Sequence, residues 1–191
     1  FERLLRTYPG FESAGVLTLR VPVPTLHYPD AAATASLHRR IESALAALPG
    51  VAAVSATTAL PLSGDTWYTA AWFPGAPGNT GAVEHDYPPV DEFTTRPGYF
   101  DVMGIPILSG RTFDAASANG RREVLIDQTL ATTFFPGRTP IGATMRALLG
   151  GSAADMTIVG VVERTRLYDV HDQDGRAQIF IRADNADGAV R

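Results

Sequence analysis

The segment Asp169–Gly175, with the sequence DVHDQDG, holds the densest set of metal-ligating side-chain types in the chain. Carboxylates and an imidazole could hold a divalent cation, and a bound cation could activate water for hydrolysis. A calcium-binding loop aligned on Gly175 would also need an acid at position 170 and a glutamate near position 181, where Val170 and Ile181 stand. A solvated acidic turn between two strands therefore explains the segment better. A weak cation site, or a metal-dependent hydrolase, stays an alternative that would use Asp169, His171, Asp172 and Asp174.

Two other segments resemble catalytic loops in part. Gly137–Thr144 has the glycine spacing of a phosphate-binding loop, but Ala143 stands where that loop needs a lysine. Ser63, in the sequence PLSGD, lacks the first glycine of a nucleophile elbow, and no histidine accompanies it in a known spacing. Neither segment predicts catalysis.

The histidines do not predict a zinc site either. They lie far apart, without the short spacings of metal ligands, at His27, His38, His85 and His171. We expect His38 on the charged surface of a helix, beside Arg39. The sequence thus predicts no catalytic residue, no cofactor-binding residue and no metal ligand.

Aromatic side chains mark two further segments. In RPGYFDVMGIPILSGRTF, residues 96–113, Tyr99, Asp101 and Arg111 could act as an acid, a base and an anion clamp. We favour a structural role, with Tyr99 and Phe100 as packing anchors and Arg111 bonding a carbonyl or carboxylate after a turn. The segment Trp67–Phe73 could instead line a ligand cleft, which makes a small-molecule or peptide-binding module an alternative function.

The composition excludes several classes of protein. Among 191 residues, 45% are hydrophobic and 19% are charged, which suits a globular domain with a real core. The net charge of −4 and the scattered arginines argue against a nucleic-acid partner. The absence of cysteine excludes disulfides and thiolate sites. No apolar run reaches the roughly 18–20 residues of a membrane-spanning helix, and the first residues, FERLLRTYPGF, do not predict a signal peptide.

The hydrophobic pattern predicts an α+β protein with several short strands. The expected helices cover Thr34–Leu48, a short turn from Tyr99 to Met103, and a helix that Asp127 caps and that ends at Pro136–Gly137. The expected strands are Gly15–Val21, Val51–Leu60, Trp67–Phe73, Pro89–Arg96, Val124–Ile126, Asp155–Arg166 and Ala177–Ala183, with a further strand after Gly104. The first strand, the first helix and the second strand predict a split βαβ unit with its helix packed on a sheet.

Four ordered segments together resemble one family. They read LPGVAAVSATTALPLSG, TRPGYFDVMGIPILSGRTF, VLIDQTLATTFFPGRTPIGATM and TIVGVVERTR. The chain resembles the periplasmic core domain of MacB/FtsX-type ABC transporter permeases, in the acidobacterial-type predicted permease branch. The resemblance runs from about Pro9 to Ile181.

The resemblance implies a Porter-like subdomain of split βαβ units with an inserted Sabre-like subdomain. On this basis we expect the end of a stalk and the first Porter-like βαβ unit in residues 1–60, the Sabre-like insertion in residues 61–175, and the start of the return to the Porter-like part in residues 176–191. The family usually returns through another strand, helix and strand. The start at Phe1 and the end at DGAVR are typical of a piece of a longer protein.

The resemblance also implies a function. In this family the domain lies on the periplasmic side of the bacterial inner membrane, between two membrane helices, and has no catalytic residues. It couples ATP hydrolysis by a cytoplasmic ABC ATPase to periplasmic substrates or partner proteins, such as an adaptor, through conformational transmission. The parent permease is expected to be a dimer, with no nucleic-acid partner, while this piece alone is expected to be soluble.

Overall fold

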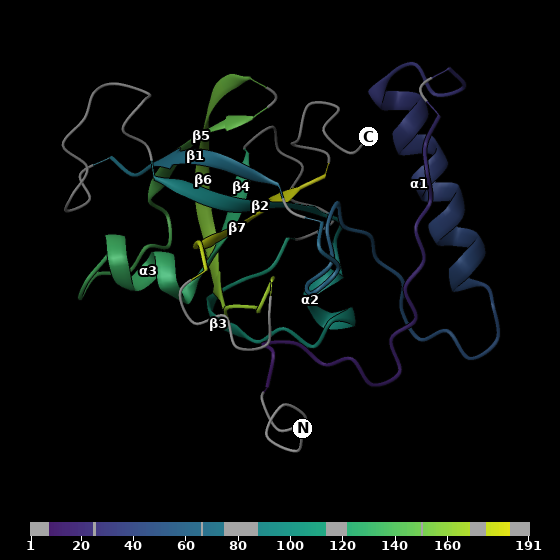
Figure 1. Ribbon diagram of the computed structural model, residues 1–191, viewed down its shortest axis with the longest axis horizontal. Coiled ribbons are helices and arrows are strands. Elements are labelled where there is room, and N and C mark those ends of the chain that lie inside the picture. The colour runs from purple at the N-terminus through teal and green to yellow at the C-terminus, as the bar shows by residue number, and fades with distance from the viewer. Residues whose placement is uncertain are drawn as a thin grey trace.

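Seven strands form one sheet that closes on itself (Figure 1). The computed structural model describes residues 8–24, 26–65, 67–74, 88–113, 122–149, 151–168 and 175–183. The strands are β1 (Tyr68–Trp72), β2 (Pro89–Thr95), β3 (Ile107–Gly110), β4 (Glu123–Asp127), β5 (Thr144–Leu149), β6 (Ser152–Val162) and β7 (Gln178–Arg182). The helices are α1 (Ala31–Ala46), α2 (Tyr99–Val102) and α3 (Gln128–Phe134). The chain is therefore a mixed α and β protein, as the sequence predicts.

The order of pairing makes the sheet a barrel. Strand β1 pairs with β2, β2 with β7, β7 with β4, β4 with β6, β6 with β5, and β5 again with β1. The pairs β2–β7 and β4–β6 are parallel, and the others in this ring are antiparallel. Strand β3 extends the sheet by pairing antiparallel with the end of β6. Closure leaves the ring strands without a long unpaired edge.

Strands β4 and β7 lie side by side and are buried on both faces. All five residues of each strand are buried, which explains their continuous apolar sequences. Val124 and Ile126 join one hydrophobic cluster, whereas Leu125, between them, joins the other. Strand β7, which we expected at the start of the return to the Porter-like part, thus runs through the centre of the sheet.

The first cluster is closed by α3. Asp127 caps this helix as predicted, since its Oδ1 accepts a hydrogen bond from the Leu130 amide at 2.9 Å. The apolar side of the helix packs Leu130, Phe134 and Phe135 against this cluster. The Phe134 ring stacks on Phe73 with 4.6 Å between the ring centroids.

The second cluster is built on the segment 96–113. Tyr99 and Phe100 of α2 are each only 2% exposed, so the predicted role as packing anchors is confirmed. The Phe100 ring packs edge-on against Phe180 of β7, with centroids 5.2 Å apart. Strand β3 then meets β6 so closely that a Cβ on Gly110 would lie 2.3 Å from the Val159 carbonyl oxygen. Gly110 also has a φ of +75°. Both the close approach of the two strands and the left-handed backbone conformation therefore require glycine there.

The predicted βαβ unit is not formed. Helix α1 matches the prediction, but its expected partner strands, Gly15–Val21 and Val51–Leu60, are not strands. Within Val51–Leu60 a single bridge joins Thr57 to Thr95 of β2. Residues 16–21 instead run as an extended segment that pairs with no strand of the described sheet. The prediction was wrong because an alternating pattern allows a strand, whereas a strand needs a partner for its hydrogen bonds.

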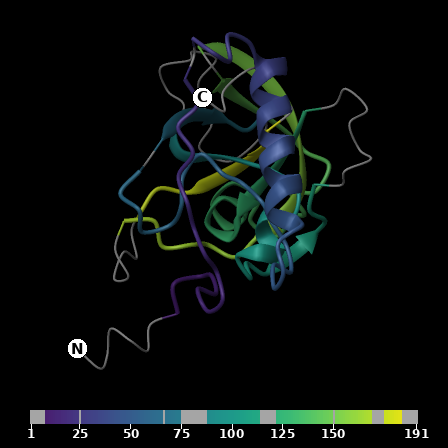
Figure 2. The same ribbon diagram turned by 90° about the vertical axis from the view of Figure 1, so that its right-hand side faces the viewer.

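Helix α1 stands at one side of the molecule rather than on the sheet, and the extended segment before it runs along the same side (Figures 1 and 2). Its apolar side chains Leu37, Ile41 and Leu45 are half-buried, and none of the described side chains of this helix is fully buried. An ion pair between Glu42 and Arg96 ties the helix to the end of β2. The predicted packing of this helix on a sheet is therefore also wrong.

The remaining predicted strands are confirmed as β1, β2, β3, β4, β6 and β7. Strand β5 was missed, because the partial phosphate-binding loop Gly137–Thr144 included only its first residue, and residues 145–149 were assigned to no element. Its inward residues, Met145 and Ala147, are fully buried, while Arg146 between them faces outward. None of the described helices has the length and apolar character needed to cross a bilayer.

Candidate functional site

A buried carboxylate and an arginine meet where three strands lie side by side. Asp91 of β2 is paired in register with Tyr68 of β1 on one side and with Gln178 of β7 on the other. Arg176 lies two residues before Gln178, so the parallel pairing of β2 with β7 brings its side chain to Asp91. Tyr168 reaches the same point from the segment that follows β6. We call Tyr68, Asp91, Tyr168 and Arg176 the Arg176 cluster.

The cluster holds its guanidinium group in one position. Asp91 Oδ1 accepts hydrogen bonds from Arg176 Nε and from the Tyr168 hydroxyl, both at 2.8 Å. Arg176 Nη2 donates to the Tyr168 oxygen. The guanidinium carbon lies 5.0 Å from the centre of the Tyr68 ring and 5.5 Å from that of Tyr168, within the range of cation–π attraction. The hydrogen bond to Asp91 is the main cause that raises the pKa of Arg176, so this residue stays charged.

The cluster is buried on the side of Asp91 and exposed on the side of its tyrosine rings. Asp91 is 1% exposed, whereas Tyr68 is 69% and Tyr168 43% exposed. Trp67, next to Tyr68, is 66% exposed. A shallow, open hollow adjoins the ring of Tyr68 and is lined by Tyr68, Thr69, Ala70, Pro89 and Leu148. Rigid aromatic rings around a fixed arginine are the side chains that dominate protein-binding surfaces.

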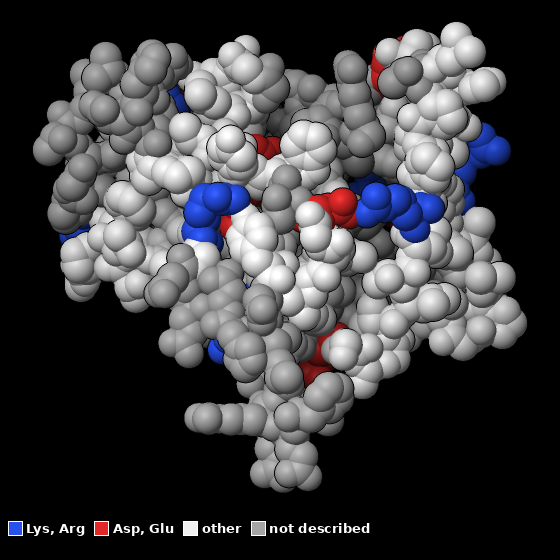
Figure 3. Space-filling view, viewed as in Figure 1, with Lys and Arg blue, Asp and Glu red and all other residues white. Residues whose placement is uncertain are grey.

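The chemistry of this arrangement is binding rather than catalysis. Asp91 is engaged by Arg176 and Tyr168, so it is not placed to take up a proton from a substrate. Over the described part of the chain, no three His, Cys, Asp or Glu side chains converge as metal ligands would. On the face shown in Figure 3, basic side chains lie separately and beside acidic ones. The cluster is therefore the candidate site that the geometry favours.

The loop Gly137–Thr144 uses its backbone donors within the fold. The Gly142 amide donates to the Ile158 carbonyl at 2.8 Å, and the Ala143 amide donates to the Pro140 carbonyl at 3.0 Å. These two groups cannot cradle a phosphate at the same time. The loop instead leads into β5.

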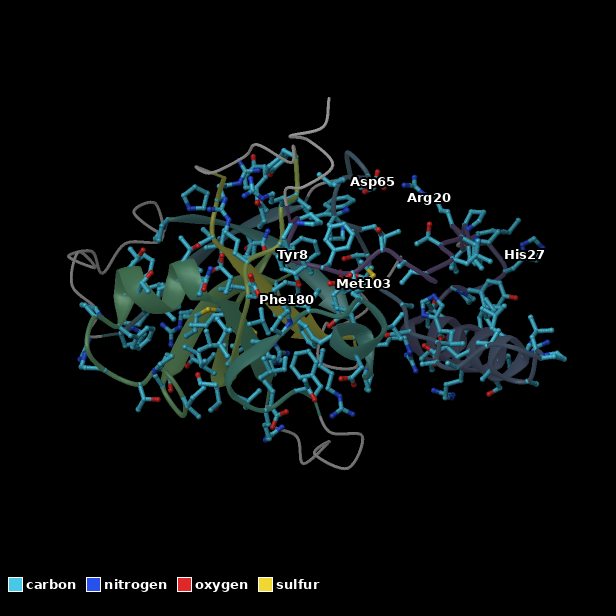
Figure 4. All side chains as sticks on the ribbon, turned by 90° about the horizontal axis from the view of Figure 1, so that it is seen from below. Tyr8, Arg20, His27, Asp65, Met103 and Phe180 are labelled. Atoms are coloured by element: carbon cyan, nitrogen blue, oxygen red, sulfur yellow. The ribbon has the colours of Figure 1, made fainter. Side chains whose placement is uncertain are left out.

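Ser63 stabilises a turn. Its hydroxyl donates to the Leu60 carbonyl at 2.8 Å and accepts from the Asp65 amide at 3.2 Å. Such local bonds are typical of serine in turns. Asp65 in turn forms an ion pair with Arg20, and the two side chains meet in Figure 4.

Tyr99, Asp101 and Arg111 do not form a site together. The Tyr99 hydroxyl is buried, and burial raises its pKa further. Asp101 is exposed, and Arg111 pairs instead with Glu123 of β4, with Nη1 to Oε2 at 3.2 Å. Arg111 also donates to the Thr112 carbonyl at 3.0 Å, so its predicted role in tying a loop is confirmed.

The histidines stay apart where they are described. His27 is exposed and lies at the end of the molecule near α1, away from Phe180 in the core (Figure 4). His38 is half-buried rather than on an open surface, and its pKa is lowered by burial and then by the charge of Arg96. His85 lies outside the described residues, as do the acidic candidates Asp169, His171, Asp172 and Asp174.

The family follows from the comparison of the whole chain with known families. The family described as the MacB-like periplasmic core domain matches residues 3–189. The chain belongs to this family. This family is the periplasmic core domain of MacB-like ABC transporter permeases. The resemblance that the four segments indicate is therefore confirmed. A comparison with curated proteins finds no match.

Solved structures show the same fold. The chain is similar to the extracellular domain of the noncanonic ABC-type transporter YknZ from Gram-positive bacteria, with 19% identity, a TM-score of 0.51, and coverage of 76% of this chain and 62% of that one. It is also similar to the periplasmic region of MacB from Actinobacillus actinomycetemcomitans, with 15% identity, a TM-score of 0.51, and coverage of 77% and 55%. The chain thus spans little more than half the length of the domains that it matches.

Sequence reasoning identified one of the four residues of the Arg176 cluster in this MacB-like domain. The aromatic segment Trp67–Phe73 was singled out; Tyr68 belongs to the cluster, and Trp67 precedes it in the chain. Asp91, Tyr168 and Arg176 were missed. One signal was present, because Asp91 lies inside the predicted strand Pro89–Arg96, where a carboxylate that becomes buried needs a partner.

Proposed function

We propose that the chain is a non-catalytic, extracytoplasmic coupling domain of an ABC transporter permease. It would lie on the periplasmic side of the bacterial inner membrane and transmit movements driven by cytoplasmic ATP hydrolysis to periplasmic substrates or partner proteins. The match of the MacB-like family over residues 3–189 is the observation that carries this proposal. The similarity to domains of two ABC-type transporters supports it at the level of the fold.

The proposal implies several partners. A cytoplasmic ABC ATPase would act through the parent permease, which we propose to be a dimer. A periplasmic adaptor or substrate protein would contact the domain directly. The exposed aromatic surface at Trp67 and Tyr68 is consistent with such a contact, and it is also what favours a binding module as the second candidate function.

We also propose a Porter-like part and a Sabre-like part within the chain. The Sabre-like part would be the barrel, and the Porter-like part would include α1 and the extended segment before it. Leu17 and Leu19 are 89% and 56% exposed, which suits a segment that another stretch of the parent protein covers. The boundaries at residues 1–60, 61–175 and 176–191 stay a prediction, and a boundary placed after β7 would keep the sheet whole.

The coupling can be tested by distance measurements in the full-length permease with its ATPase. The 191 residues contain no cysteine, so Leu108→Cys on β3 would introduce one exposed label site in this domain. In the proposed dimer, we expect the spin-label distance between the two copies to change when ATP is added. An ATPase variant that binds but does not hydrolyse ATP serves as the control. An unchanged distance distribution through the whole ATP cycle would contradict the proposal.

A further inference from the structure

We propose that the Arg176 cluster, together with Trp67, binds a carboxylate-bearing segment of a partner protein. The inference rests on the proposed function, because it names the surface and the chemistry by which the domain would contact its periplasmic partner. It starts from the arrangement of charge: a fixed guanidinium lies among exposed aromatic rings and above a buried carboxylate.

The guanidinium is held in place before any partner arrives. Nε bonds to Asp91, Nη2 bonds to Tyr168, and the rings of Tyr68 and Tyr168 flank the group. Asp91 cannot move away, because it is 1% exposed and lies within paired β2. A partner therefore does not have to order a flexible arginine, which is a major cost of binding to such side chains.

One edge of the guanidinium remains for a ligand. No described residue bonds to Arg176 Nη1, and the side chain is 37% exposed. The hydrogen bonds that Arg176 and Tyr168 donate to Asp91 both end on Oδ1 at the base of the cluster, on the side away from solvent. The outward N–H groups match a carboxylate better than any neutral acceptor, since charge-assisted hydrogen bonds are about twice as strong.

The surroundings favour a protein segment over a small molecule. Trp67, Tyr68 and Tyr168 are 66%, 69% and 43% exposed, and Leu62 is 40% exposed. The Leu62 amide bonds to the Leu167 carbonyl at 2.9 Å, so the Leu62 backbone lies beside the residue that precedes Tyr168. Small-molecule sites are enclosed, whereas the hollow beside Tyr68 is shallow and open. Apolar side chains next to the carboxylate would pack on these rings.

A second arginine provides a matched control. Arg146 lies 5.8 Å from the centre of the Trp72 ring and forms two hydrogen bonds to Asp155, at 2.6 and 3.0 Å. Here the carboxylate is on the surface, since the Asp155 side chain is 55% exposed and that of Arg146 41%. An arginine, an aromatic ring and an aspartate are thus present in both places, but the aspartate is buried only in the Arg176 cluster.

The test is a selection of random peptides displayed on phage against the 191-residue chain. The binding of enriched peptides is then measured on Arg176→Gln, Trp67→Ala and the control Arg146→Gln. Arg176→Gln removes the positive charge that compensates the buried carboxylate of Asp91, so its effect on folding has to be separated from its effect on binding. Trp67→Ala keeps the ion pair and therefore provides an independent variant. Acrylamide quenching in a Trp72→Phe background reports on Trp67 alone, since the chain has two tryptophans.

We expect the enriched peptides to carry Asp or Glu beside apolar residues and to protect Trp67 from quenching. Their affinity should fall about tenfold or more for Arg176→Gln and Trp67→Ala, stay within about twofold for Arg146→Gln, and weaken as salt is added. No enrichment, peptides without acidic residues, or equal binding by all variants would overturn the proposal. Displacement of the peptides by free succinate at equal concentration would assign the site to small carboxylates instead. Failure here would leave the coupling function untouched, because that function is measured by ATP-driven distances in the parent permease.

Discussion

Two regions of the chain are both predicted to form strands and end in different structures. In the barrel, Glu123–Asp127 and Gln178–Arg182 become strands whose residues are all buried. Near the N-terminus, residues 16–21 remain extended, with Leu17, Leu19 and Val21 exposed. The barrel strands have neighbours on both sides, whereas the extended segment has none in the described sheet. The difference shows that a strand-like sequence permits burial, while neighbouring strands decide whether its side chains are buried.

Truncation of a buried ring should show this contrast most strongly. Phe100 is 2% exposed and contacts the rings of Tyr99, Phe113 and Phe180. We expect Phe100→Ala to lower the free energy of unfolding by about 3–5 kcal/mol. Leu17→Ala, at a residue that is 89% exposed, should change it by less than about 0.5 kcal/mol. Urea unfolding would measure both, and equal losses would mean that the extended segment is part of the packed core.

A glycine substitution tests how closely β3 approaches β6. Gly110→Ala combines a φ of +75° with a Cβ placed 2.3 Å from the Val159 carbonyl oxygen. We expect a loss of about 2–3 kcal/mol in the free energy of unfolding. Gly137→Ala is the control, because its φ is +67° but no atom lies within 4 Å of the added Cβ, so the loss should be about 1 kcal/mol. Thermal unfolding of the two variants side by side would decide, and a larger loss for the control would refute the close approach.

A change of pH should affect the barrel through Asp127. Burial raises the pKa of this carboxyl from 3.8 to about 6 in the folded protein. The folded state therefore binds the proton more tightly than the unfolded state, and acidification from about pH 7 to about pH 5 should add about 1 kcal/mol to the free energy of unfolding through this group.

The matched variant for this effect is Asp127→Asn, which keeps an oxygen to cap α3 and removes the titration. Urea unfolding at both pH values, compared between the two proteins, isolates the contribution of Asp127 from those of other carboxyls. The contribution should be complete below the unfolded pKa and lost as the pH rises through about 6. An identical pH dependence of the two proteins would show that Asp127 is not the responsible group.

The sequence specified the local features of this domain. The pattern of Leu37, Ile41 and Leu45 predicted α1, Asp127 predicted the start of α3, and continuous apolar runs predicted β4 and β7. The dense segment 96–113 was correctly interpreted as a packing element, because its aromatic residues and glycines leave few other roles. Four segments, through their residues and their order along the chain, also indicated the family.

Only the tertiary structure decided which segments pair and which side chains meet. Residues 16–21 have a strand-like sequence but no partner strand, and the order of the barrel strands cannot be read from alternation alone. Asp91 and Arg176 are 85 residues apart in the chain and become neighbours because β2 and β7 pair in parallel. Periodicity and capping act between residues that are close in sequence, whereas pairing and burial depend on contacts between distant ones.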